Sequence, residues 1–191
     1  MKRMLRVAIL LCAISASGVH AKGITERAVP VPQTVSTELQ ALIGNGPLPW
    51  WNTHPRTAQE WKKWVGELAK EAAATLPALR EKMGVTVADG TMNGVRTFTL
   101  TPKTLAANNR DRVLLHLHGG GYVLNPGEAG TLEAVYMAGF GGINVVSVDY
   151  RMPPDFPYPA ALDDALAVYR ELLKTYPPEK SAYSAHPPGA A

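Results

Sequence analysis

Cysteine is almost absent from this chain of 191 residues. The only cysteine, Cys12, lies inside a short apolar run near the N-terminus. After this run the sequence therefore offers no disulfide, no thiol nucleophile and no cysteine-based zinc site. It also has no later segment that is long and apolar enough to cross a bilayer, which needs about 20 apolar residues.

An excess of one charge is missing from most of the chain. The formal net charge is +3, from 19 lysines and arginines against 16 aspartates and glutamates. Lys2, Arg3 and Arg6 account for that whole excess, so the remaining residues are neutral overall. A basic chain can indicate nucleic-acid binding, but an excess confined to six residues excludes that interpretation, and we expect no nucleic-acid partner.

Low-complexity and fibrous proteins are excluded by composition. Hydrophobic residues make up 46% of the chain and charged residues 18%, as in globular proteins. The length fits one modest domain, whereas a large enzyme fold would have to be incomplete in 191 residues.

Residues 1–21 have the layout of a secretory signal peptide. A basic segment (1–6) precedes an apolar run (7–14, VAILLCAI) and a small-residue segment (15–21) that ends in a small-x-small cleavage site. The apolar run is too short for a stable membrane anchor. We expect cleavage after Ala21, a secreted or periplasmic location and no integral membrane segment in the mature protein.

Residues 22–83 predict an N-terminal arm followed by cap-like helices. Four prolines interrupt the arm, which has one helical stretch near residues 35–43. The sequence TAQE at 57–60 is a capping box, and the apolar spacing after it predicts an amphipathic helix that ends near Pro77. Its tryptophans indicate a packing face rather than a cofactor site, although such a helix could also cover a substrate pocket.

Residues 84–180 predict an α/β sheet. Alternating β-rich runs with Asn-Gly turn signals indicate an antiparallel hairpin. Short apolar runs indicate buried strands, and their alternation with helical patterns indicates parallel crossover connections. In chain order, the predicted elements are hairpin strands at 85–87 and 95–101, a strand at 112–117, a helix at 131–138, a strand at 143–148 and a helix at 159–175.

The sequence HGGGY at residues 118–122 follows a predicted buried strand directly. Successive glycines leave backbone N–H groups unshielded and permit positive φ. At the end of a parallel strand, such a loop can aim N–H donors at the oxyanion of an acyl-transfer reaction. A dinucleotide fingerprint fails because Leu124 occupies its third glycine position, and the Gly-Lys-Ser/Thr of a phosphate-binding loop is absent. A flexible turn is the remaining alternative.

Two further blocks accompany this loop. Residues 149–154 have the pattern D-Y-R-x-x-P, and residues 156–165 have F-P-A-A-x-x-D-A with an extra Tyr-Pro inside. With these motifs the sequence resembles the hormone-sensitive-lipase-like esterases of the α/β-hydrolase fold, from about Val85 to Lys180. The resemblance implies a partial α/β-hydrolase sheet, an antiparallel hairpin and then parallel strands with crossover helices, preceded by the N-terminal cap-like helices.

The resemblance also implies roles for the loop residues. The oxyanion hole would comprise Gly119, Gly120 and Gly121, with the amides of the last two as donors and Gly119 shaping the turn. His118 would brace the loop and Tyr122 would line the substrate pocket. The family draws its general base from much later in the chain, so His118 is not expected to be the base. We expect a small-molecule ester as ligand, with no cofactor and no metal.

Other polar residues near these motifs are interpreted as structural. His116 alternates with His118 on the predicted strand, and a metal pair is the alternative interpretation. A buried structural histidine is favoured because no carboxylate lies nearby in the sequence. Asp149 and Arg151 are interpreted as hydrogen-bond partners rather than catalysts.

The catalytic triad of such an esterase is not identifiable. The fold needs a serine in G-x-S-x-G, then an acid, then a histidine, and the sequence contains no such serine motif. Residues 181–191 are polar, proline-bearing and unlike a core strand. Codons compatible with this tail also encode, in a shifted frame, an apolar strand followed by Gly-Thr-Ser-Ala-Gly-Gly.

We therefore expect an out-of-frame tail at 181–191 and an inactive, truncated or frameshifted form of an exported carboxylesterase. In that case the strand at 143–148 would lack its next parallel neighbour. The alternative is a non-catalytic exported binding module that uses the glycine loop and the arm around Trp50 and Trp51.

Overall fold

The computed structural model describes residues 30–45, 50 and 52–185. They fall into two units, residues 1–52 and 53–191. The expected signal peptide at 1–21, Trp51 of the arm and the last six residues of the tail lie outside the described residues.

In the first unit, helix α1 spans Thr37–Gly44. The side chain of Ser36 caps it by accepting a hydrogen bond from the N–H of Leu39 at 3.3 Å. Ser is a favoured N-cap because it satisfies one of the free N–H groups of the first turn. The helical stretch expected near residues 35–43 is confirmed.

In the second unit, helix α2 spans Ala58–Met83 and begins at the expected capping box. Thr57 Oγ1 accepts a hydrogen bond from the N–H of Glu60 at 3.2 Å. The Glu60 carboxylate in turn accepts one from the N–H of Arg56 at 2.8 Å, one residue earlier than in the standard motif. Of the helices in the described ranges, none has the length and hydropathy that a membrane crossing needs.

The expectation that this helix ends near Pro77 is wrong. The helix continues to Met83 and ends at Gly84, whose φ of +60° provides a left-handed cap. Leu76 is only 1% exposed, and α2 packs against α3 on the far side of the proline. Tertiary packing therefore offsets the hydrogen bond that proline cannot donate.

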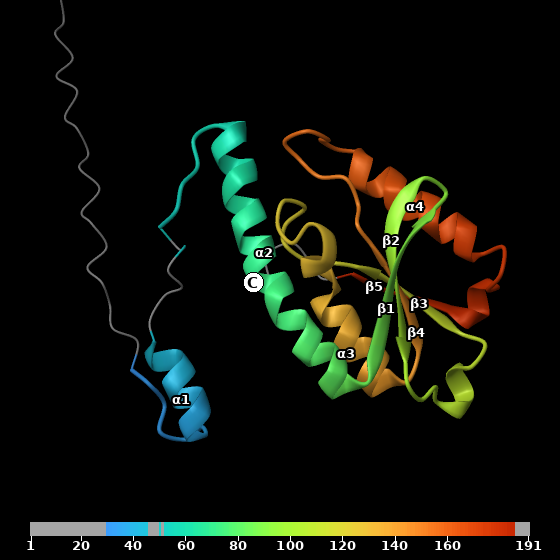
Figure 1. The fold of residues 1–191 in the computed structure, drawn as a ribbon, viewed down its shortest axis with the longest axis horizontal. Coiled ribbons are helices and arrows are strands. Elements are labelled where there is room, and N and C mark those ends of the chain that lie inside the picture. Colours follow the sequence, from blue (N-terminus) through green and yellow to red (C-terminus); the bar gives the residue numbers. More distant parts are fainter. Residues whose placement is uncertain (1–29, 46–49, 51, 186–191) are drawn as a thin grey trace, which may run out of the picture. The chain divides into compact units, whose positions relative to one another are not determined.

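The five strands form one sheet in the order β1-β2-β4-β3-β5 (Figure 1). β1 pairs antiparallel with β2 and β2 with β4, whereas β3 runs parallel to both β4 and β5. The expected hairpin is confirmed, with its turn at Asn93 and Gly94, where φ is +48° and +82°. The strands are β1 (Val85–Met92), β2 (Val95–Pro102), β3 (Val113–Leu117), β4 (Asn144–Val148) and β5 (Ser181–Ala185).

β4 is not the exposed strand that the sequence predicted. It lies between β2 and β3, with Val145 opposite both Leu100 and Leu114. Val145 and Val148 are 0% exposed. The prediction is wrong because the chain places β3 outside β4, so that β4 has neighbours on both edges.

The tail is unlike a core strand, as expected, but the sequence did not predict that Ser181–Ala185 form a strand at the edge of the sheet. These residues form β5, which pairs parallel with β3 from Val113 to Leu117. Ladder hydrogen bonds come from the backbone and do not require apolar side chains. The side chains of β5 are half-buried or exposed, and Tyr183 is 79% exposed. The out-of-frame origin of the tail concerns the coding DNA and stays a prediction.

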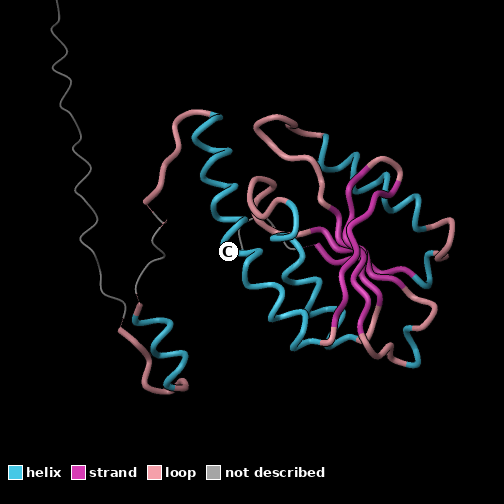
Figure 2. Tube along the Cα trace, in the orientation of Figure 1, coloured by secondary structure: helices cyan, strands magenta, loops and turns pink. Residues whose placement is uncertain are grey.

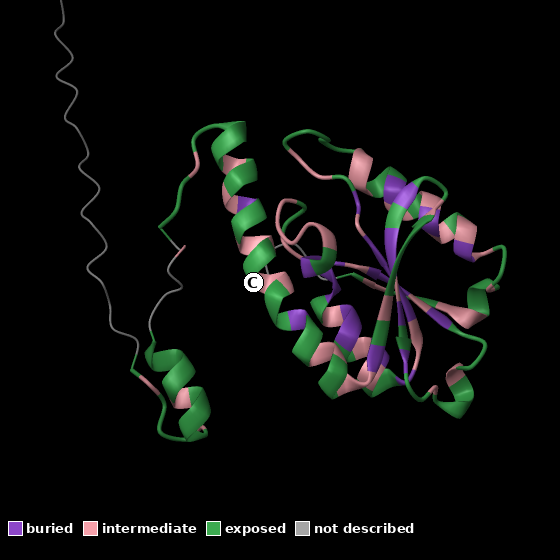
Figure 3. Ribbon diagram, in the orientation of Figure 1, coloured by how far each residue is buried: buried purple, intermediate pink, exposed green. Residues whose placement is uncertain are grey.

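Helices cover both faces of the sheet, and Figures 1 and 2 show α2 and α3 (Leu132–Gly141) on one side and α4 (Ala160–Leu172) on the other. Each face has its own apolar core, which Figure 3 shows as buried segments on the facing elements. The α4 side is centred on Val146, Val148, Val168 and Leu172, and the α3 side on Phe98, Leu100, Ala134, Val135 and Val145.

The apolar spacing of α4 predicts a buried face that differs from the observed one; the predicted face comprises Leu162, Ala165, Leu166, Tyr169, Leu172 and Leu173. Leu162 and Leu166 are 49% and 39% exposed, whereas Asp164 is 4% exposed. The helical period was predicted correctly, but the face is rotated. Asp164 turns inward because its carboxylate binds the guanidinium and the N–H of Arg151.

Two glycine-to-alanine variants test the packing of α2 on α3. A Cβ at Gly139 in α3 would lie 3.1 Å from Met83 Cβ and 3.2 Å from Met83 O. Gly139→Ala is expected to lower the free energy of unfolding by about 1–3 kcal/mol through overpacking. At Gly66 in α2 nothing lies within 4 Å of an added Cβ, so Gly66→Ala should raise it by about 0.5–1 kcal/mol. Urea titration followed by circular dichroism measures both, and equal changes would refute the packing.

Candidate functional site

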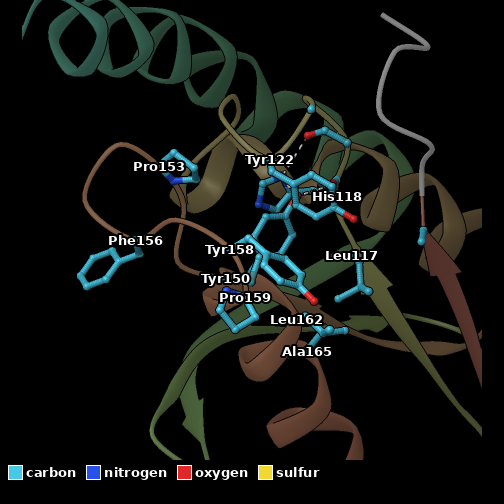
Figure 4. Close-up of a pocket in the computed structure, with 14 residues that line it drawn as sticks. Leu117, His118, Tyr122, Tyr150, Pro153, Phe156, Tyr158, Pro159, Leu162 and Ala165 are labelled. Carbon is cyan, nitrogen blue, oxygen red and sulfur yellow. Dashed lines mark hydrogen bonds between the residues drawn. The ribbon is translucent and has the colours of Figure 1, made fainter. Parts of the chain in front are cut away.

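A pocket of about 340 Å³ opens where β3 ends (Figure 4). It is bounded by the glycine loop, by the segment between β4 and α4, by the first turns of α4 and by the end of β5. None of its lining residues is Asp, Glu, Lys or Arg. The lining residues are Leu117, His118, Gly119, Gly121, Tyr122, Tyr150, Pro153, Phe156, Tyr158, Pro159, Ala161, Leu162, Ala165 and Ala185.

Helix α2 does not line this pocket. Its residues Trp61 and Val65 line a neighbouring cavity of about 330 Å³, beside the segment that connects β4 to α4. The rings of Trp61 and Trp64 meet edge to face, with centroids 5.1 Å apart. The helix therefore stands next to the pocket rather than over it.

The carbonyl of Gly119 is held by two side chains. Its oxygen lies 3.0 Å from His118 Nδ1 and accepts a hydrogen bond from Asn125 Nδ2 at 3.1 Å. The peptide bond that follows is trans, and in a planar trans peptide the C=O and the next N–H point in opposite directions. The N–H of Gly120 therefore points away from His118 and Asn125.

The next peptide is held in the same way by the backbone. The carbonyl oxygen of Gly120 accepts hydrogen bonds from the N–H of Val123 at 3.1 Å and of Leu124 at 3.0 Å. The N–H of Gly121 is thereby turned away from these donors. Across residues 52–185, the N–H groups of Gly120 and Gly121 donate to no acceptor. Within the described residues the loop thus has two adjacent N–H donors without an acceptor, at Gly121, which lines the uncharged pocket, and at its neighbour Gly120.

Positive φ angles make this geometry possible. Gly120 has φ of +119° and Gly121 of +62°, values that glycine adopts without steric cost. A Cβ at Gly120 would lie 2.8 Å from both Cβ and O of Leu124, whereas a Cβ at Gly121 would meet nothing within 4 Å. Two glycines that look alike in the sequence are therefore under different constraints.

His118 lies behind the loop and is 5% exposed. Its ring stacks on Tyr150 with centroids 4.2 Å apart, and the Tyr150 hydroxyl donates to the His118 carbonyl at 2.5 Å. Burial lowers the pKa of His118 below its ordinary value, which favours the neutral ring. A neutral ring that donates from Nδ1 to Gly119 suits the bracing role that the resemblance implies.

Asp149 and Arg151 form hydrogen bonds and ion pairs with segments next to the glycine loop. Asp149 accepts a hydrogen bond from the N–H of Gly127 at 2.8 Å and lies 3.3 Å from a guanidinium nitrogen of Arg96. Arg151 binds the Asp164 carboxylate at 2.8 Å. Both residues contact protein groups, as the structural interpretation expected.

His116 lies in a buried polar row that resembles a hydrolase triad in composition. His116 Nδ1 is 2.9 Å from Ser147 Oγ, and His116 Nε2 is 3.5 Å from the Glu133 carboxylate. Ser147 is 1% exposed and His116 is 0% exposed, so no substrate reaches the hydroxyl. Glu133 was not predictable as a neighbour of His116, because the two meet only when α3 packs on the sheet. Within the described ranges, no group of three or more His, Cys, Asp or Glu side chains could hold a metal ion.

Tyr122 and Asn125 complete the loop. Tyr122 has φ of +64°, is 53% exposed and lines the pocket, with its ring centroid 5.9 Å from that of Tyr150. Asn125, which the sequence interpretation missed, has φ of +66° and bonds Gly119. The turn signal Asn-Pro-Gly at 125–127 could have marked it, since Asn tolerates the left-handed region.

Comparison with known proteins supports an esterase fold. Residues 114–187 match a family model described as alpha/beta hydrolase fold. Versiconal hemiacetal acetate esterase of Emericella nidulans is 34% identical over 119 residues, which cover 62% of this chain and 39% of that protein. Human hormone-sensitive lipase is 30% identical over 82 residues, 43% of this chain and 8% of that protein.

A solved structure also supports the α/β-hydrolase fold. The crystal structure of an esterase, E25, superposes with a TM-score of 0.76 at 37% identity, covering 85% of this chain and 51% of that one. The chain thus spans about half the length of this esterase and less of the two curated relatives.

The two loop glycines give a matched pair of variants. Gly120→Ala combines an unfavourable φ with a clash against Leu124 and is expected to lower the free energy of unfolding by about 2–5 kcal/mol. Gly121→Ala meets open space and carries only the left-handed strain, about 1–2 kcal/mol. Thermal unfolding of both variants beside the unmodified chain measures the difference. Equal losses would contradict the loop geometry described above.

Proposed function

Because the chain has the α/β-hydrolase fold and resembles the hormone-sensitive-lipase-like esterases, we propose that its glycine loop binds the oxyanion formed in carboxylic-ester hydrolysis. One observation carries the proposal. The carbonyls of Gly119 and Gly120 both accept hydrogen bonds, which leaves the next two N–H groups without an acceptor among residues 52–185, at and beside an uncharged pocket.

Each loop residue has a defined role in this proposal. The amides of Gly120 and Gly121 donate to the carbonyl oxygen of the ester, and both hydrogen bonds strengthen as negative charge develops on that oxygen. Gly119 shapes the turn, His118 braces it from behind, and Tyr122 lines the substrate pocket. Preorganised donors of this kind need no rearrangement as the charge forms, and each is typically worth a factor of about 10²–10³ in rate.

Nucleophilic attack requires a group that the sequence does not present. The printed 191 residues contain no G-x-S-x-G motif, and the one buried serine beside a histidine is sealed in the core. We infer that this polypeptide binds neutral esters without turning them over, and that hydrolysis needs a serine, an acid and a base from outside these residues. The alternative of a non-catalytic binding module gains no support from the comparisons, whose named relatives are esterases and a lipase.

Ester binding can be followed directly on the glycine amides. The chain has 17 glycines, which a ¹⁵N-glycine label makes visible by NMR. Titration with cyclohexyl acetate is expected to shift the Gly120 and Gly121 resonances downfield, because their N–H groups gain an acceptor. Gly90, which is exposed in strand β1 and lines neither cavity, should not move. If neither loop amide responds while the chain is folded, the oxyanion role is refuted.

Turnover is measured on the same sample with p-nitrophenyl acetate. We expect a rate far below about 1 s⁻¹, because no nucleophile is activated and only the residual catalysis of the oxyanion donors remains. Hydrolysis at ordinary enzyme rates, above about 1 s⁻¹, would overturn the inference that the polypeptide is inactive.

We also propose that residues 1–21 direct export. Supporting this, they combine a basic start, an apolar run and a small-x-small site ending at Ala21. Expression of the full chain in a bacterium with a Sec pathway should yield a periplasmic product whose N-terminal sequence begins at Lys22. Replacing Leu10 and Leu11 by arginine breaks the apolar run and should leave the precursor uncleaved. An unprocessed cytoplasmic chain from the unmodified gene would refute export.

A further inference from the structure

The pocket carries more exposed aromatic surface than packing requires. Tyr158 is 85% exposed and Tyr122 is 53% exposed, and both line the pocket beside the buried ring of Tyr150. We name these three side chains, Tyr122, Tyr150 and Tyr158, the aromatic wall. Figure 4 draws these three side chains among the residues that line the pocket, in the central part of the view. Large apolar rings left open at a cavity are typical of ligand contact.

Phe156, the other aromatic residue of the lining, is engaged elsewhere. The guanidinium carbon of Arg151 lies over its ring, 5.4 Å from the centroid. In Figure 4 its ring points away from the wall. Arg151 is itself fixed by Asp164. One face of the Phe156 ring is therefore occupied by Arg151, and Phe156 is 45% exposed against 85% for Tyr158, which is the more open ring of this segment.

Tyr158 stands at a fixed point of the chain. It lies two residues before Ala160, where α4 begins, so the start of that helix holds its backbone at the edge of the pocket.

The charge and the volume of the pocket restrict the kind of ligand that it can bind. No lining side chain is acidic or basic, apart from the neutral His118, so a charged substituent in contact with the side chains would lose its hydration without gaining an oppositely charged partner. The volume of about 340 Å³ lies at the small end of the range for small-molecule sites. A single ring attached to a short ester fits these limits.

We propose that the pocket selects uncharged esters that carry one aromatic ring, and that Tyr158 makes this selection by packing against that ring. This inference rests on the proposed function, because it places the ester carbonyl at Gly120 and Gly121 and the arene at the aromatic wall. Aromatic pairs gain attraction beyond the area they bury through offset or edge-to-face contact. Tyr158 is then a specificity-determining residue rather than a catalytic one.

The test compares two esters of nearly equal size, phenyl acetate and cyclohexyl acetate. Both are titrated into the ¹⁵N-glycine-labelled full chain, and dissociation constants are taken from the amide shifts. Phenyl acetate is expected to bind about 3- to 10-fold more tightly, the range that one aromatic pair supplies. Tyr158→Ala should remove this preference and leave cyclohexyl acetate within about twofold, whereas Tyr158→Phe should keep it.

Tyr183→Ala is the matched control. Tyr183 is 79% exposed, close to the 85% of Tyr158, but it does not line the pocket. Because both tyrosines are largely exposed, neither alanine variant should unfold the chain, and circular dichroism checks this. Tyr183→Ala should leave both dissociation constants unchanged.

The outcomes separate the two proposals. Equal binding of the two esters, or an aromatic preference that survives Tyr158→Ala, would overturn the selection by Tyr158. A preference for phenyl acetate that Tyr158→Ala removes, with no shift at Gly120 or Gly121, would support the aromatic wall and refute the oxyanion role. Binding of neither ester would refute both.

Discussion

Four hydrogen bonds to two carbonyl oxygens hold the glycine loop, and the candidate site depends on them. Two reach Gly119 from side chains, and two reach Gly120 from the backbone that turns back after it. Because a trans peptide opposes its C=O and N–H groups, bonding the carbonyls from behind aims the next two N–H groups outward. No side chain needs to point at the ligand. The donors are backbone atoms, and the surrounding residues serve to orient them.

Contacts between distant segments hold this arrangement in place. Arg80 of α2 binds Glu128 and Thr131, at the ends of the short helix η2 (Gly127–Thr131). Within η2, Gly130 lies so close to the His118 ring that an added Cβ would fall 2.8 Å from it. The α2 helix therefore supports the loop through η2 although it does not line the pocket. Its length beyond Pro77 has a structural consequence, because Arg80 lies in that part.

The site is polar in its backbone and apolar in its side chains. The loop offers backbone N–H donors, while the side chains that line the pocket carry no charge apart from the neutral His118. Such a division suits a neutral ester, whose charge appears only as it reacts, since donors in a dry pocket act more strongly on a developing charge. The same walls leave aromatic rings open to the ligand. In the proposals made above, recognition of the ester carbonyl and recognition of its substituent therefore fall to different parts of the pocket.

The sequence by itself determined the type and order of most elements, and it placed the glycines after β3. These features are local: the period of apolar residues, the capping box at Thr57, the Asn-Gly turn and the HGGG motif each act within a few residues. Only the tertiary structure decided that β4 is central, that β5 pairs with β3, which face of α4 is buried and that Glu133 meets His116. Those outcomes depend on contacts between segments far apart in the chain, where packing overrides local preference. Asn125 illustrates both cases. Its turn is a local feature that the sequence indicates, whereas its hydrogen bond to Gly119 exists only once the loop has folded.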